Sequence, residues 1–154
     1  MLTLEDIGAR AANAKRVLAC AGSQKKDEAL KNIARALIDR QQEILNANGA
    51  DVRNGEQAGL TPALLDRLRL DDKRMRDMAD SVLKVADMED PVGKILSGSS
   101  RPNGLKIRKI TVPLGVIAII YEARPNVSSD AATLCLKAGN AVILRGGKEA
   151  LQSN

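Results

Sequence analysis

Histidine and most aromatic residues are missing from this sequence. It has no histidine, tryptophan or phenylalanine, and Tyr121 is the one aromatic residue among 154. The absence of histidine excludes Cys–His and Ser–His nucleophile pairs and histidine-based metal sites within these residues. With no further aromatic side chain to stack on bases, a nucleic-acid surface is disfavoured. Any core must be built from Leu, Ile, Val, Ala and Met, which an apolar content of 44% permits.

Cysteine is scarce, and long apolar runs are absent. Two cysteines, Cys20 and Cys135, fit a reduced cytoplasmic protein better than a disulfide scaffold and cannot fill a four-ligand zinc site. We expect both to be small core residues, because a reactive thiol needs an exposed, electropositive position. No run approaches the ~18 apolar residues of a membrane span. The N-terminus has Glu5 and Asp6 but no apolar signal region, so no secretory signal is predicted. For the reasons given above, no membrane span and no metal site are predicted either.

Charge is unevenly distributed along the chain. Residues 1–90 carry 15 basic and 16 acidic side chains, whereas residues 91–154 carry 9 basic and 3 acidic ones. No acidic residue occurs between Asp90 and Glu122. A basic half indicates an anionic ligand, such as a phosphorylated substrate, a dinucleotide or nucleic acid, or else a solvated surface.

Helical spacing of apolar residues predicts a helical block over residues 3–88. Four helix starts have capping residues: Thr3 with Asp6 in a capping box, Ser23, Thr61 before Pro62, and Asp71. Five helices are predicted, over residues 3–21, 23–49, 50–58, 61–68 and 71–88. Gly49 is expected to close the second helix, and the third is short. Met75 and Met78 are expected to fill the core rather than bind a ligand. The block carries no obvious chemistry.

Turn residues follow the helical block. The sequence Pro102-Asn103-Gly104 is a typical hairpin apex, with arms at Lys94–Ser99 and Leu105–Thr111 and a slip in the alternation before Ile110. A two-stranded arm is marginal by itself, so it is a candidate for oligomerisation. A basic ribbon for nucleic acid is the lower-ranked alternative.

Residues Thr111–Ala150 have the pattern of a strand, a helix and a second strand. The apolar runs are Gly115–Tyr121 and Ala141–Leu144, and the helix opens at Pro125 or Ser128 and closes at Gly139. Such a unit predicts parallel strands, and the uninterrupted first run predicts a strand covered on both faces. Ligands bind at the carboxyl ends of strands in open α/β sheets, which directs attention to the two loops there.

Each of these loops has a candidate site and a plainer interpretation. Arg145-Gly146-Gly147 follows the second strand and suits a phosphate. Glycines let a ligand approach the backbone closely, and an arginine side chain can donate two parallel hydrogen bonds to an anion. A tight turn that ends a strand explains the same residues. After the first strand, Arg124 is a candidate for binding a carboxylate or phosphate, and Asn126 for supporting an oxyanion. A helix start with an early proline is the alternative there.

The strings VPLGVIAIIYEARPNV and LCLKAGNAVILRGGKEA closely resemble the N-terminal part of the γ-glutamyl phosphate reductase (glutamate-5-semialdehyde dehydrogenase) family. LTPALLDRLRLDDKRMRDMADSV and the DPVG turn resemble it too, so the resemblance covers essentially the whole chain. It implies an α/β, aldehyde-dehydrogenase-like fold. The implied activity is NADPH-dependent reduction of L-glutamyl 5-phosphate to the semialdehyde with release of phosphate, a step of proline biosynthesis, through a cysteine thioester.

The resemblance also implies roles for particular residues. Arg145 matches a strand end where relatives touch the adenosine ribose or its 2′-phosphate, and Gly146, Gly147 and Glu149 share that cofactor-facing turn. Asn126 matches a candidate oxyanion-supporting asparagine, and Arg124 is a substrate-anion candidate. The family's nucleophilic cysteine lies far downstream of these strings. We therefore expect a fragment, without turnover of its own.

The resemblance sets the expected organisation and partners. Residues 1–90 are expected to be a helical segment, 91–111 an oligomerisation-type ribbon, and 112–154 the first βαβ unit of a Rossmann-like NADP-binding domain. A cytoplasmic homo-oligomer is implied, with glutamate 5-kinase as a candidate partner and without nucleic acid or membrane. The rival hypotheses are a non-catalytic assembly protein derived from the reductase and, ranked lower, a basic nucleic-acid binder.

Overall fold

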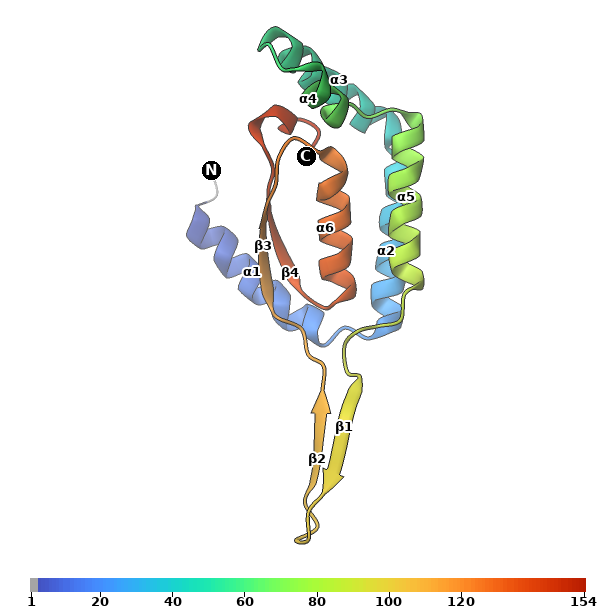
Figure 1. Cartoon of the computed structure of the whole chain (residues 1–154), viewed down its shortest axis with the longest axis vertical. Coiled ribbons are helices and arrows are strands. Elements are labelled where there is room, and N and C mark those ends of the chain that lie inside the picture. Colours follow the sequence, from blue (N-terminus) through green and yellow to red (C-terminus); the bar gives the residue numbers. More distant parts are fainter. Residues whose placement is uncertain (1–2) are drawn as a thin grey trace.

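The computed structural model of the chain describes residues 3–154, with helices and two small sheets (Figure 1). The elements in chain order are α1 (Leu4–Ala19), α2 (Ser23–Asp39), α3 (Gln41–Gln57), α4 (Pro62–Leu68), α5 (Asp72–Asp87), β1 (Ile95–Ser100), β2 (Lys106–Ile110), β3 (Val116–Ile120), α6 (Pro125–Lys137), β4 (Ala141–Arg145) and the 3-10 turn η1 (Lys148–Ala150).

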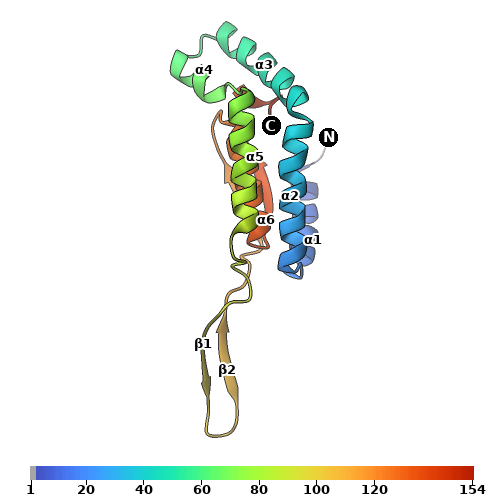
Figure 2. The same cartoon turned by 90° about the vertical axis from the view of Figure 1, so that its right-hand side faces the viewer.

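The body of the molecule is layered around strands β3 and β4. The two strands pair in parallel from Val116↔Ala141 to Ile120↔Arg145, as the sequence predicts. Helix α1 packs on the strands, and α6 packs on β4 and in turn against α2 and α5 (Figure 1). Helices α3 and α4 lie at the end where β3 and β4 finish (Figures 1 and 2). An expected βαβ unit is thus surrounded by the expected helical block.

Three of the four predicted capping residues begin helices where the sequence places them. The prediction of Ser23 as a cap is wrong, because Ser23 is the first residue of α2 and the N-cap is Gly22, which has no side chain to cap the helix. The Thr3 hydroxyl accepts from Asp6 N at 3.1 Å while the Asp6 carboxylate accepts from Thr3 N at 3.0 Å, which is the predicted capping box. The side chains of Thr61 and Asp71 cap α4 and α5 by accepting from Leu64 N and Arg74 N, without the reciprocal bond of a capping box. Helix α6 begins at Pro125 rather than Ser128, and its N-cap residue Arg124 makes no capping bond.

The prediction of one helix over residues 23–49 is wrong. The chain leaves helical geometry at Arg40, and α3 then runs through Gly49 to Gln57. Residues 39–43 are all polar, so no apolar contact holds one straight helix together there. Gly49 does not end α3 because Val52 lies beyond it and is buried, which offsets the roughly 1 kcal/mol cost of an interior glycine.

Strand β3 is not covered on both faces, contrary to the expectation from its apolar run. Val116, Ala118 and Ile120 are exposed, whereas Ile117 and Ile119 are half-buried. The reason is that α6 packs on β4, and within residues 3–154 nothing covers the second face of β3. β3 is therefore an apolar edge strand in this structure.

Strands β1 and β2 form an exposed ribbon that projects from the body (Figures 1 and 2). They are antiparallel, and the register changes between Ile95, opposite Ile110, and Ser97, opposite Lys109. Leu96 is thus an extra residue in a bulge, which accounts for the predicted slip before Ile110. Gly104 adopts φ +84 in the predicted turn. The apolar side chains Ile95, Leu96, Leu105, Ile107 and Ile110 remain exposed.

Two buried lysines hold α2, α6 and the root of the ribbon together. Lys26 is 2% exposed, and its Nζ lies 2.6 Å from Asp90 and donates to Lys137 O at 3.1 Å. Lys137 is 3% exposed, and its Nζ lies 2.5 Å from Asp27 and donates to Ala86 O at 2.8 Å. Burial raises the pKa of Asp90, but bonds from Lys26 and Val92 N outweigh it and leave the pKa below its usual range. The hydrogen bond from Lys137 likewise lowers the pKa of Asp27.

Replacing Lys26 by methionine tests this network. Lys26→Met removes one partner of a largely buried pair, so we expect the free energy of unfolding to fall by about 3 kcal/mol in urea denaturation. The matched control is Lys73→Met, which breaks an exposed pair with Asp77 and is expected to change stability little. Equal effects of the two substitutions would contradict a structural role for the buried pair.

Candidate functional site

Parallel pairing brings the two candidate loops to one edge of the sheet. Residues 121–124 follow β3, residues 146–147 follow β4, and Tyr121 N donates to Arg145 O at 3.1 Å. The sequence predicts this juxtaposition, because the carboxyl ends of parallel strands lie at the same edge.

The glycine turn after β4 packs closely on the loop after β3. A Cβ on Gly147 would lie 2.7 Å from Glu149 Oε2 and 3.3 Å from Ala123 N. A Cβ on Gly146 would overlap the Asn154 side chain and approach the Tyr121 ring to 3.3 Å. A side chain at either position would displace the end of Asn154 or Glu149 and press on Tyr121 or Ala123, which agrees with the tight-turn interpretation.

A short hydrogen-bonded chain crosses the same turn. The Tyr121 hydroxyl and Ser128 Oγ are 2.6 Å apart, and Ser128 Oγ donates to Asn154 Oδ1 at 2.6 Å. Arg145 is exposed at the end of β4. A cofactor that approached Gly146 and Gly147 would displace the ends of the Asn154 and Glu149 side chains, and both of these are flexible.

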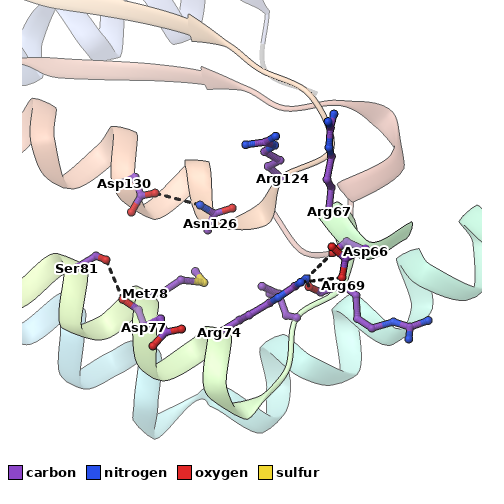
Figure 3. Close-up of a pocket in the computed structure, with 11 residues that line it drawn as sticks. Asp66, Arg67, Arg69, Arg74, Asp77, Met78, Ser81, Arg124, Asn126 and Asp130 are labelled. Carbon is purple, nitrogen blue, oxygen red and sulfur yellow. Dashed lines mark hydrogen bonds and ion pairs between the residues drawn. The ribbon is translucent and has the colours of Figure 1, made fainter. Parts of the chain in front are cut away.

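A groove of about 400 Å³ lies between α4, α5 and the N-terminus of α6 (Figure 3). We call it the arginine groove because Arg67, Arg69, Arg74 and Arg124 line it. The buried side chains of Leu70 and Met78 supply apolar lining. Two sequence candidates, Arg124 and Asn126, come together here, whereas Arg145, Gly146, Gly147 and Glu149 do not line the groove.

The four arginines of the groove differ in their partners. Arg74 pairs with Asp66 at 2.8 Å and also bonds the carbonyl oxygens of Asp66 and Arg69. Arg69 turns to Glu56 at 3.4 Å. The guanidinium groups of Arg67 and Arg124 make no ion pair or hydrogen bond with residues 3–154, and Figure 3 shows them on the same side of the groove. Two positive charges therefore remain available to a ligand.

The amide of Asn126 is already engaged. Its Nδ2 donates to Asp130 Oδ2 at 3.2 Å, one turn further along α6 (Figure 3). Support of an oxyanion by Asn126 would require this bond to break. Because Arg124 makes no capping bond, the first turn of α6 also presents backbone N–H groups without a side-chain cap.

Neither cysteine lies in the groove. Cys135 is buried in α6, as predicted, and burial raises the pKa of its thiol. Cys20 is exposed, so its prediction as a core residue is wrong; it follows the last residue of α1, beyond the face that packs on the strands. The C-terminal end of α1, which Cys20 follows, lies near the root of the ribbon, at the other end of the body from α4 (Figure 1).

Two buried polar residues of α3 fix the elements around the groove. Asn48 Nδ2 donates to Leu68 O at 2.8 Å, and its Oδ1 accepts from Leu70 N at 2.7 Å, which holds the α4–α5 link. Asp51 accepts from Ser153 N and Oγ, both at 2.7 Å. An apolar cluster joins the same parts: Val52, Leu68, Ala123 and Ala150.

Sequence reasoning missed Arg67, Asn48 and Asp51. Arg67 is one of many charged residues in the helical block, and nothing in its local pattern distinguishes it. Asn48 and Asp51 sit in a stretch interpreted as a helix end, so their burial gave no local signal. Among residues 3–154 no group of three or more acidic or cysteine side chains is placed to hold a metal ion. The described helices include none long and apolar enough to span a membrane.

Comparison with known proteins gives a consistent result. The chain is 57% identical to the γ-glutamyl phosphate reductase of Moorella thermoacetica over 99% of this chain and 37% of that protein, and 52% identical to that of Dehalococcoides mccartyi over 100% and 36%. The crystal structure of the Thermotoga maritima γ-glutamyl phosphate reductase superposes with a TM-score of 0.93 at 42% identity, over 95% of this chain and 35% of that one.

The resemblance to γ-glutamyl phosphate reductase is confirmed. The Saccharomyces cerevisiae γ-glutamyl phosphate reductase, at 33% identity, also gives a TM-score of 0.93, over 99% of this chain and 39% of that one. The predicted fold class is confirmed by the same two superpositions. The chain spans a little over a third of the length of the curated γ-glutamyl phosphate reductases that it matches. A scan against family models gives no match.

Removing the Asn48 side chain is expected to loosen the groove. Asn48→Ala leaves a buried carbonyl and a buried N–H without partners, so we expect a loss of about 1–3 kcal/mol in unfolding free energy. Hydrogen exchange should accelerate first at Leu70, whose N–H loses its acceptor. The control is Asn46→Ala, an exposed position of the same helix, which should leave both measurements nearly unchanged. Protection of Leu70 that survives Asn48→Ala would contradict this role.

Proposed function

We propose that this chain forms part of an NADPH-dependent reductase that converts L-glutamyl 5-phosphate to L-glutamate 5-semialdehyde and releases phosphate. The observation that carries the proposal is the 52–57% identity to proteins named γ-glutamyl phosphate reductase over at least 92% of the chain. The reaction belongs to proline biosynthesis and, on this proposal, takes place in the cytoplasm.

The turn after β4 is the proposed cofactor contact. Arg145 is exposed with its guanidinium available for the 2′-phosphate of NADPH, and Gly146 and Gly147 allow the backbone to approach a ligand. Glu149 lies beside Gly147 and would reorient as the cofactor binds. The cofactor supplies the hydride of the reduction; the chain's own contribution here is to bind and orient it.

The arginine groove is the proposed substrate contact. Arg124 would hold an anionic group of L-glutamyl 5-phosphate, and Asn126 would stabilise the developing oxyanion after leaving Asp130. The thiolate that displaces phosphate is assigned to neither cysteine of this chain. Cys135 is buried with a raised pKa, and Cys20 follows α1, whose C-terminal end lies at the other end of the body from α4 (Figure 1). We accordingly expect no turnover by residues 1–154 alone.

The exposed ribbon favours assembly as a second proposed function. Ile95, Leu96, Ile107 and Ile110 are exposed on a two-stranded arm that has only its own hydrogen bonds within residues 3–154. A homo-oligomer that buries this ribbon would stabilise it. Glutamate 5-kinase, which would supply the acyl phosphate, is the further partner that the proposed reaction implies.

NADPH titration tests the cofactor assignment. We expect NADPH to shift the backbone NMR resonances of residues 145–149 and of Tyr121 and Ser128, whose contacts with Asn154 it would disturb. Arg145→Gln removes the guanidinium proposed to meet the 2′-phosphate, so the affinity for NADPH should fall about tenfold while that for NADH stays within about twofold.

The control variant is Arg101→Gln at the tip of the ribbon, which removes the same charge far from the turn. It should leave both affinities unchanged. If Arg145→Gln lowered the affinities for NADPH and NADH equally, Arg145 would not bind the 2′-phosphate. Absence of any shift at residues 145–149 would refute the cofactor contact itself.

A further inference from the structure

Three Asn-Gly pairs occur in the sequence, and the fold places them in two kinds of surroundings. Asn48-Gly49 and Asn54-Gly55 lie inside helix α3, whereas Asn103-Gly104 lies in the turn that joins β1 and β2. Such a pair is prone to modify itself, because glycine has no side chain to shield its backbone nitrogen from the asparagine side chain. The backbone conformation at each pair then decides whether the two groups can meet.

The modification of an Asn-Gly pair is deamidation. The backbone nitrogen of glycine gives up its proton to solvent and attacks the side-chain carbonyl carbon of asparagine. The new C–N bond closes a succinimide ring, and the side-chain nitrogen takes up a proton and leaves as ammonia. Water then opens the ring to give aspartate or, where the other carbonyl is attacked, isoaspartate. Nothing is oxidised or reduced, and water is the co-reactant.

Helix α3 protects the two pairs that it contains. In an α-helix the glycine N–H donates to a carbonyl one turn earlier, and the helical backbone holds the asparagine carbonyl carbon away from that nitrogen. Asn48 is in addition 2% exposed, and both ends of its side-chain amide are hydrogen-bonded. Asn54 is exposed, so the helical backbone is what protects this pair. Asn54 therefore separates the effect of exposure from that of backbone conformation.

The turn at Asn103 has the opposite properties. Every residue from 93 to 110 is exposed, and the ribbon carries this turn away from the body (Figure 2), so its apex can open locally at small cost. A Cβ on Gly104 would find no atom of residues 3–154 within 4 Å apart from its chain neighbours. Asn103 Oδ1 accepts from Leu105 N at 3.1 Å, which polarises the carbonyl that is attacked.

We propose that Asn103 is a site of spontaneous deamidation, which the fold selects among the three Asn-Gly pairs. The reaction places an acidic group in a region where every other charged side chain is basic. Within residues 91–111 these are Lys94, Arg101, Lys106, Arg108 and Lys109. The charge of the surface proposed for assembly thus changes with the age of the protein. The reaction needs no substrate and no cofactor, so it is independent of the proposed function.

Tryptic peptide mapping of the incubated whole chain tests the proposal. Trypsin cuts after lysine and arginine but not before proline, so the three pairs fall on three peptides, 41–53, 54–67 and 95–106. At mildly alkaline pH, mass spectrometry should find deamidation at Asn103 at least about tenfold faster than at Asn48 or Asn54. The chain is kept at a concentration at which light scattering shows a monomer, because an oligomer that buried the ribbon would also cover Asn103.

The same incubation in guanidinium chloride is the matched control. Unfolding removes α3, so the three pairs should react at rates within about threefold of one another. Gly104→Ala, measured in the unfolded chain, should slow deamidation of Asn103 about tenfold, because the added Cβ shields the attacking nitrogen. Gly98→Ala makes the same change in β1, where a Cβ would make ordinary contacts, and should alter the rate in the folded chain less than about twofold.

Two results would overturn the proposal. In the folded chain, deamidation of Asn54 as fast as that of Asn103 would show that exposure, and not backbone conformation, selects the site. An Asn103 that stays intact in the folded chain while all three pairs react in guanidinium chloride would show that the turn protects it as α3 protects the others.

Discussion

The parallel pairing of β3 with β4 is the constraint on which the arrangement of the site depends. It places the loop of residues 121–124 beside the turn of residues 146–147, because both strands end at the same edge. The glycines of the turn then allow the two loops to touch through Ala123 and Tyr121. Without this register, the candidate residues of the two loops would lie at unrelated places on the surface.

Buried polar groups hold the helices against this small sheet from both ends. At the ribbon end, Lys26 and Lys137 cross-link α2 and α6, and each ammonium also bonds a backbone carbonyl. At the groove end, Asn48 and Asp51 tie α3 to the α4–α5 link and to the last residues of the chain. The elements around the groove are held by directional bonds, and the loss of such a bond costs more than its presence contributes.

Local signals predicted most of the fold and about half of the candidate site. Capping residues, the hairpin turn and the βαβ pattern are local, and the structure contains all three. The break at Arg40 was missed because helix breaks without Gly or Pro leave no residue-level mark. The exposure of Val116 and Ile120 was missed because an apolar run predicts that other elements pack on both faces of the strand. Within residues 3–154 no element packs on the second face of β3. Arg124 and Asn126 were found because they adjoin a strand end, whereas Arg67 has no such neighbour.

The pairing of charges in the arginine groove shows why tertiary geometry decides this part of the site. Asp66 precedes Arg67 in the chain, yet adjacent helix residues do not face each other, and Asp66 pairs with Arg74 across the α4–α5 link instead. That choice leaves Arg67 without an ion-pair partner among residues 3–154, on a helix whose last carbonyl is bonded by Asn48. The sequence contains enough acids to neutralise every arginine here, so the residual charge follows from the fold.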